Sequence, residues 1–159
     1  MTYSRPVKLF IAVGFSLLAG AIGSIFTSSS VSGWFTTLVK PALNPPSWLF
    51  GPVWTALYVL MGIAAFVVWS NVDVMREERK RALWAFALQL ILNATWSVLF
   101  FGLQSPLLAL FGIALLWLAI LWTLVVFSRI SRPAAWLLAP YLLWVTFASY
   151  LNYATWTLN

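Results

Sequence analysis

The feature that most constrains this chain is a series of long apolar runs separated by short polar segments. Each run has about 20 residues, and an α-helix of that length, rising 1.5 Å per residue, crosses a hydrocarbon core of about 30 Å. The runs predict an all-α integral membrane protein, a bundle of five transmembrane helices forming one domain over residues 1–159. We expect helices at about 7–26, 48–69, 82–102, 107–127 and 134–156.

Composition agrees with a membrane protein and removes several classes of chemistry. The chain is 63% hydrophobic and 8% charged, more apolar than soluble domains of this size. It contains no Cys and no His, so thiolate nucleophiles, imidazole bases and the usual zinc and haem ligands are missing. Its acidic residues, Asp73, Glu77 and Glu78, lie together in one polar segment. The sequence therefore predicts no metal site, no required cofactor and no hydrolytic centre.

The basic residues are distributed unevenly between the two sides of the expected bundle. The side with the N-terminus holds eight of them, Arg5, Lys8, Arg76, Arg79, Lys80, Arg81, Arg129 and Arg132, and the other side holds Lys40. The positive-inside rule then places the N-terminus in the cytoplasm and the C-terminus outside. Because these charges flank apolar spans, membrane lipids are the expected anionic neighbours, and no nucleic-acid partner is predicted.

The first apolar run is open to two interpretations. Its basic start and the small residues around Gly20 resemble a secretory signal, but the run continues through Ile25 and Phe26, which favours a retained helix. Gly20, Gly23 and Ser24 give it a surface of small residues that admits either a neighbouring helix or a flat ligand.

The segment 27–47 is long for a connection between adjacent helices and is a candidate lid. Trp34, within it, fits either a lid contact or an interfacial anchor. At its end, Asn44 is the expected N-cap of the second helix, with a proline pair in the first turn. Pro52 should bend this helix beside Gly51 and open room for a ligand.

Three helix faces combine aromatic and polar side chains. In the second span Phe50, Trp54, Tyr58 and Met61 share a face that suits either helix packing or a ligand. In the third span Gln89, Asn93, Trp96 and Phe100 share a face whose amides need partners inside the bundle or across a dimer seam, and this face favours helix packing over ligand contact. In the fifth span Tyr141, Trp144, Ala148, Leu151 and Thr155 lie along one face.

Three strings in these spans resemble the TspO/MBR family of translocator proteins, also called tryptophan-rich sensory proteins or peripheral-type benzodiazepine receptors, in its bacterial form. They are KPxxNPPxW with GPVWTALYxLMGIA at 40–64, QLxLNxxWSxxFF at 89–101 and AAWLLAPYLLWVTFASYLN at 134–152. The resemblance covers nearly the whole chain. It implies a five-helix homodimer in a bacterial cell membrane that binds porphyrins and other flat apolar ligands between the first, second and fifth helices.

The resemblance also implies particular ligand contacts. These fall on Ser24, Thr27, Phe50, Gly51, Val53, Trp54, Leu108, Phe111, Leu115, Ala148 and Leu151. Trp54 and Trp144 match two tryptophans linked to light-dependent porphyrin breakdown in similar bacterial proteins. Leu43 replaces an aromatic residue of the lid. Cholesterol binding is not predicted, because no basic residue follows Tyr153 where the family's sterol pattern requires one.

Three functions follow as hypotheses. The first is a binder of porphyrins or other tetrapyrroles that acts as sensor, carrier or regulator, since an aromatic cavity suits a large planar ring. The second is an enzyme that degrades porphyrin in light, with Trp54 or Trp144 donating an electron to the excited ring. The third is a transporter of porphyrin or another small molecule, although the spans offer no embedded charges for ion coupling.

Overall fold

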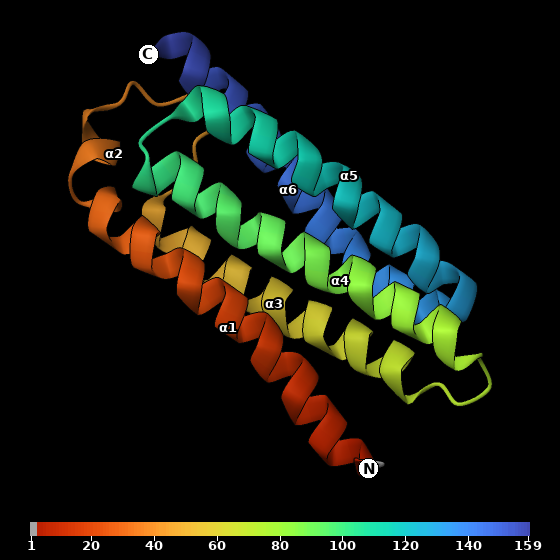
Figure 1. Cartoon of the computed structure of the whole chain (residues 1–159). Helices are drawn as coiled ribbons and strands as arrows, with labels where there is room; N and C mark the ends of the chain where they lie inside the picture. The colour runs from red at the N-terminus through yellow and green to blue at the C-terminus, as the bar shows by residue number, and fades with distance from the viewer. Residues whose placement is uncertain (1–2) are drawn as a thin grey trace.

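The computed structural model describes residues 3–159 and contains five long helices packed in one bundle (Figure 1). They are α1 (Arg5–Val31), α3 (Ser47–Ser70), α4 (Arg76–Ser97), α5 (Pro106–Ile130) and α6 (Arg132–Leu158). A short helix, α2 (Trp34–Thr37), follows α1, and α4 continues into a π-helical turn, η1 (Val98–Gly102). Each of the five helices is long and apolar enough to cross a membrane, which confirms the predicted fold class.

Several helices extend beyond their predicted ends. α1 continues to Val31, so the first residues of the expected lid are helical. Its polar end stays helical because the hydroxyls of Thr27, Ser28 and Ser29 donate to carbonyls three or four residues earlier. α4 begins at Arg76, inside the segment expected to be a loop. Acidic residues in its first turn are favourable there, because the N-terminus of a helix carries partial positive charge.

The predicted N-cap of the second span was wrong by two residues. α3 begins at Ser47, and its N-cap is Pro46 in extended backbone (φ −55°, ψ 140°) rather than Asn44. The Asn44 side chain donates instead to the Pro45 carbonyl at 3.1 Å. The reason is local, because a proline disfavours helical backbone in the residue before it, so Pro46 keeps Pro45 outside the helix. The predicted Ser105 cap is confirmed, since its hydroxyl accepts the Leu108 amide.

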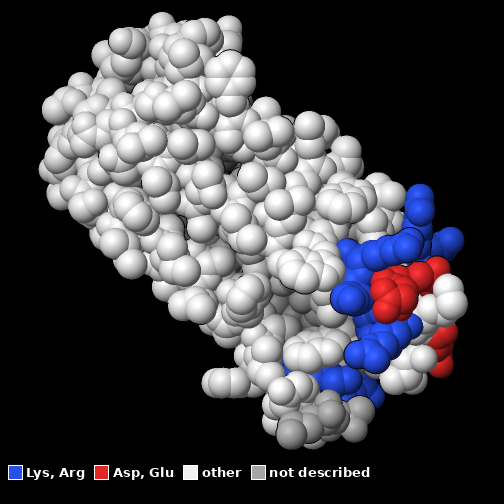
Figure 2. Space-filling view, viewed as in Figure 1, with Lys and Arg blue, Asp and Glu red and all other residues white. Residues whose placement is uncertain are grey.

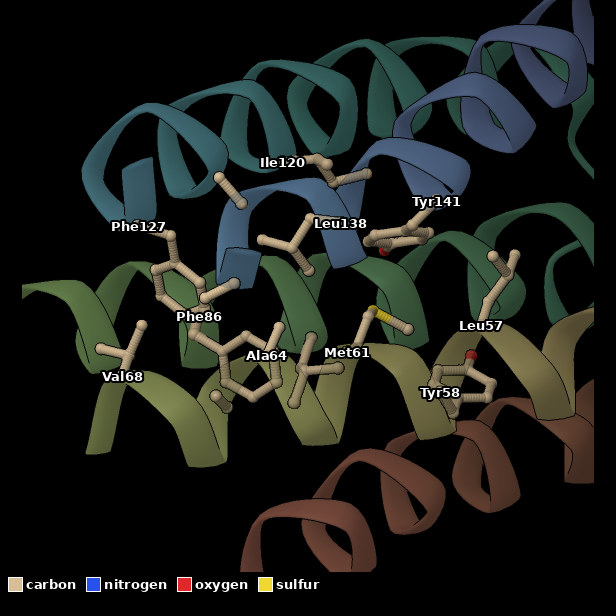
Figure 3. Close-up of a cluster of buried hydrophobic side chains, with 14 of the residues drawn as sticks. Leu57, Tyr58, Met61, Ala64, Val68, Phe86, Ile120, Phe127, Leu138 and Tyr141 are labelled. Carbon is tan, nitrogen blue, oxygen red and sulfur yellow. The ribbon is translucent and has the colours of Figure 1, made fainter. Parts of the chain in front are cut away.

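The hydrophobic core lies between α3, α4, α5 and α6, toward the end of the bundle that carries the loop between α3 and α4 (Figure 3). Met61, Phe127 and Tyr141 are completely buried in it. α1 packs against α3 at close range, since a Cβ at Gly62 would lie 2.5 Å from the Val13 Cα. α5 packs on α4 and α6, whereas α1 packs on α3 and α4. α1 and α5 therefore lie on opposite sides of the bundle.

The two ends of the molecule differ in charge. In Figure 2 the Lys and Arg side chains gather at one end, with the acidic residues among them. This is the end where Figure 1 places the N-terminus and the loop between α3 and α4. The opposite end carries α2 and the C-terminus (Figure 1). The charge asymmetry read from the sequence is thus also an asymmetry in space.

Candidate functional site

A cavity of about 460 Å³ lies in the half of the bundle nearer α2. Its volume falls within the range of about 300–1,000 Å³ that is usual for small-molecule sites. α1, α3, α4 and α6 form its walls, and residues from α2 and η1 close it toward one end. Its largest side chains are aromatic: Phe35, Phe50, Trp54, Tyr58, Trp96, Phe100, Phe101 and Trp144.

Most of the predicted ligand contacts meet in this cavity. They come from three helices: Gly20, Gly23, Ser24 and Thr27 from α1, Phe50, Gly51, Trp54 and Tyr58 from α3, and Trp144, Ala148 and Leu151 from α6. Each set lies along one face of its helix, as its spacing of three and four residues predicts. Met61 and Tyr141, on the same faces, lie in the core instead.

The expected contacts on α5 do not meet the cavity. Leu108, Phe111 and Leu115 are 49%, 65% and 57% exposed on the outer face of that helix. Because α5 packs on α4 and α6, the cavity lies on the far side of those two helices. These three residues therefore do not line this cavity, and their contact with a ligand stays a prediction.

Two further predicted residues lie beside the cavity rather than in its wall. Val53 packs against the hydrophobic core. Trp34 packs edge-on against Phe100, with ring centroids 5.7 Å apart. Neighbouring side chains on a helix differ in direction by about 100°, so in the single turn of α2 the next residue, Phe35, takes the position facing the cavity.

The sequence interpretation omitted one wall. It placed the cavity between the first, second and fifth spans, but α4 and η1 supply Asn93, Trp96, Ser97, Phe100 and Phe101. The polar and aromatic face of the third span was the available signal. That face also fits helix packing, because buried amides in membrane bundles commonly join helices, so the pattern alone did not indicate a cavity wall.

The buried amides do join helices, and they do so at the cavity wall. The Tyr58 hydroxyl donates to the Asn93 side-chain oxygen, and the Asn93 amide donates to the Tyr141 hydroxyl at 3.0 Å. Nearby, Trp96 donates to the Asn152 side-chain oxygen at 3.0 Å. These bonds connect α3, α4 and α6, so they fix the positions of the aromatic rings around the cavity.

The aromatic rings are held in defined orientations. Trp54 stacks on Tyr58 with centroids 5.6 Å apart and an angle of 28° between the ring planes. Trp144 meets Phe50 edge-to-face at 6.0 Å. Offset stacking and edge-to-face contact are the favourable geometries for aromatic pairs. The walls therefore offer preformed flat surfaces to a planar ligand.

The hydrogen-bonding groups of the cavity are mostly acceptors. The hydroxyls of Ser24, Thr27, Thr55 and Thr155 each donate to a carbonyl of their own helix. A hydroxyl that has donated its proton still accepts through its oxygen. The Trp144 indole N–H is different, because it is buried and has no partner within residues 3–159.

One cation lies near the α2 end of the cavity. Lys40 Nζ lies 5.1 Å from the centre of the Phe35 ring, and that ring lines the cavity. The neighbouring residue Val39 is joined to α6, because the Asn159 side chain accepts its amide at 2.9 Å and donates to its carbonyl at 3.1 Å. Leu43 is 63% exposed. The segment after α2 thus carries a positive charge to the edge of an apolar cavity.

Comparison with known proteins gives one consistent result. Residues 12–157 match the TspO/MBR family. The tryptophan-rich protein TspO of Chlorobaculum tepidum is 48% identical over 153 residues, which cover 96% of each chain. The translocator protein of Bos taurus is 37% identical over 151 residues, which cover 93% of this chain and 89% of the bovine one. The tryptophan-rich sensory protein of Cereibacter sphaeroides is 37% identical over 126 residues, 79% of this chain and 77% of that one.

Proposed function

Because this chain belongs to the TspO/MBR family, we propose that it is a membrane protein that binds a porphyrin or a related planar tetrapyrrole in the cavity between α1, α3, α4 and α6. The observation that carries this proposal is the pairing of two indoles, Trp54 and Trp144, on walls of one preformed apolar cavity. Stacking on aromatic side chains suits a large flat ring. The chain has no His or Cys, so a metal-free ring fits better than haem held by its usual axial ligands.

The polar groups of the site support one orientation of the ring. An apolar macrocycle is favoured deep in the cavity, among Phe50, Trp54 and Trp144. Its carboxylates are favoured at the end near Lys40, where a cation lies beside water. Burying an unpaired carboxylate among Phe50, Trp54 and Trp144 would be costly, so this orientation avoids the larger penalty.

A fluorescence titration tests this binding. Protoporphyrin added to the purified protein should quench tryptophan emission saturably. Trp54→Phe and Trp144→Phe each reduce the aromatic surface of the cavity and should each weaken binding by about 2- to 10-fold, the usual contribution of one aromatic pair. Absence of saturable quenching in the wild type would refute the proposal.

The orientation is tested with Lys40→Gln and two ligands. Lys40→Gln should weaken binding of the free acid by about 2- to 5-fold, as for a solvent-exposed ion pair. It should leave the dimethyl ester of the same porphyrin unaffected, because the ester carries no charge. Equal losses for acid and ester would show that Lys40 acts by supporting the segment after α2.

A second candidate function is light-driven breakdown of the bound ring. It is favoured by the place of Trp54 and Trp144 on the cavity wall, where an indole can give one electron to the excited ring. The indole is then oxidised and the porphyrin reduced. The absorption band of bound porphyrin should bleach faster under illumination with the wild type than with the double variant Trp54→Phe, Trp144→Phe. Equal rates would leave binding as the function.

A further inference from the structure

We propose that a groove at the basic end of the molecule binds the headgroup of an anionic phospholipid. The groove has a volume of about 410 Å³ and lies between the end of α3 and the first turns of α4. It is lined by Trp69, Arg76, Arg79, Lys80, Leu83, Trp84 and Ala87. None of these residues lines the aromatic cavity, so the groove is a separate site.

The first argument is the arrangement of charge around α4. With 3.6 residues per turn, the six α4 residues of the groove fall within an arc of about 140° on one face of the helix. Glu78 falls on the opposite face and Glu77 near the edge of the arc. The groove face of the first turns therefore carries three basic residues and no acidic one. Figure 2 shows basic side chains gathered at this end of the molecule.

The second argument is that one cation in the groove and one beside it are already held by other contacts. Arg79 Nη1 donates to the Asn71 carbonyl at 2.6 Å, which holds its guanidinium against the loop between α3 and α4. A guanidinium has five N–H donors, so this contact leaves others for a phosphate. Lys8 Nζ lies 5.8 Å from the centre of the Trp69 ring and brings a further charge from α1. A partly ordered site loses less entropy when it binds an anion.

The third argument is the order of side-chain types along the groove, from basic to apolar. Its basic residues lie in the first turns of α4, and Leu83, Trp84 and Ala87 follow deeper in the span. Arg76 and Ala87 are about 16 Å apart along the helix axis, at 1.5 Å per residue. That length matches a phosphate headgroup followed by the upper part of an acyl chain. Trp84 is 66% exposed and Ile91, further along, is 62% exposed, so both present apolar surface to a chain.

These features favour a lipid over a soluble anion. Tryptophans are enriched where membrane meets water, and Trp69 and Trp84 mark that level on α3 and α4. Basic pockets at this level of a helix bundle recognise anionic headgroups. A soluble phosphate would use the cations but not the apolar half of the groove. The occupant we assign is therefore an anionic phospholipid in the leaflet at the basic end.

The test is native mass spectrometry of the detergent-purified protein during a titration with phosphatidylglycerol or phosphatidylcholine. The wild type should retain phosphatidylglycerol in preference to phosphatidylcholine. The double variant Arg76→Gln, Lys80→Gln should bind phosphatidylglycerol about 30-fold more weakly, from the usual contribution of two basic residues near an anionic surface. Both side chains are exposed, so the fold should survive, and circular dichroism would verify this.

A matched control distinguishes binding at this groove from a general attraction by the positive charge at this end of the molecule. Arg129→Gln, Arg132→Gln removes the same net charge from the other basic turn and should weaken phosphatidylglycerol binding by less than about threefold. The exchange Arg76→Lys, Lys80→Arg should keep the binding. Equal losses in the two Gln variants, or no preference between the lipids, would overturn the proposal. Displacement of the lipid by excess glycerol phosphate would also overturn it, by assigning the groove to a soluble phosphate.

Discussion

At Gly20, α1 packs directly against the ring of Tyr58 on α3, and both residues line the cavity. Substitution of Gly20 by alanine should therefore disturb the cavity wall by an amount that can be calculated. A Cβ built on Gly20 would collide with the ring of Tyr58. That ring is 8% exposed, stacks on Trp54 and donates to Asn93, so it has little room to move. We expect Gly20→Ala to displace Tyr58 or to push α1 away from α3.

The size of the effect follows from three contributions. Overpacking a close contact costs about 1–3 kcal/mol. Loss of the hydrogen bond between Tyr58 and Asn93 costs about 0.6 kcal/mol, the average for a bond between membrane helices. Alanine favours the helical state over glycine by about 0.5–1 kcal/mol. The net destabilisation should be about 1–3 kcal/mol, and porphyrin affinity should fall because Trp54 loses its support.

Gly51→Ala is the matched control. Gly51 lines the same cavity, yet a Cβ there would have no neighbouring atom within 4 Å. This variant should be as stable as the wild type or more stable by up to about 1 kcal/mol. Reversible unfolding in mixed micelles of dodecyl maltoside and dodecyl sulfate, followed by circular dichroism, measures both. Stabilities of the two variants within about 0.5 kcal/mol of each other would refute the close contact between α1 and α3.

Three further predictions concern other parts of the molecule. Asn93→Leu should destabilise the bundle by about 1–3 kcal/mol in the same assay, because it removes the partner of two buried tyrosine hydroxyls. Phe111→Ala should change porphyrin affinity less than twofold in the fluorescence titration, because this side chain lies on the outer face of α5; a larger loss would place that face in the site. Asn159→Ala should speed hydrogen exchange of the Val39 amide by about 2- to 10-fold, since that amide loses its acceptor.

Helix number and type were predictable because the cost of exposing backbone polar groups to lipid leaves few alternatives. The faces of α3 and α6 that line the cavity were also predictable. Trp54 and Trp144 each have other aromatic or small side chains three and four residues away along the chain, which places them on one helix face. The ends of the helices were not predictable. The run 27–31 is polar in composition, but the hydroxyls of Thr27, Ser28 and Ser29 donate to carbonyls within α1, and that of Ser30 donates to the Phe101 carbonyl.

The α4 wall was the main part of the site that sequence reasoning did not place. A buried amide such as Asn93 serves both to join helices and to line a cavity, and its sequence position does not separate the two roles. The contacts expected on α5 lie outside the cavity for another reason. Phe111 is apolar on an apolar helix, so periodicity does not distinguish its lipid face from a ligand face.

The π-helical turn η1 (Val98–Gly102) has a consequence for insertions and deletions. A π turn is equivalent to one residue inserted into an α-helix. Removing one residue from it should restore 3.6 residues per turn and eliminate the wide turn that carries Phe100 and Phe101, because a π turn absorbs an extra residue locally and leaves the helix on either side in register. α2 would lose its contacts with Phe100, while the part of α4 before the turn would keep its register. A single deletion here would therefore remove aromatic support from α2 without shortening the transmembrane part of α4 that precedes the turn.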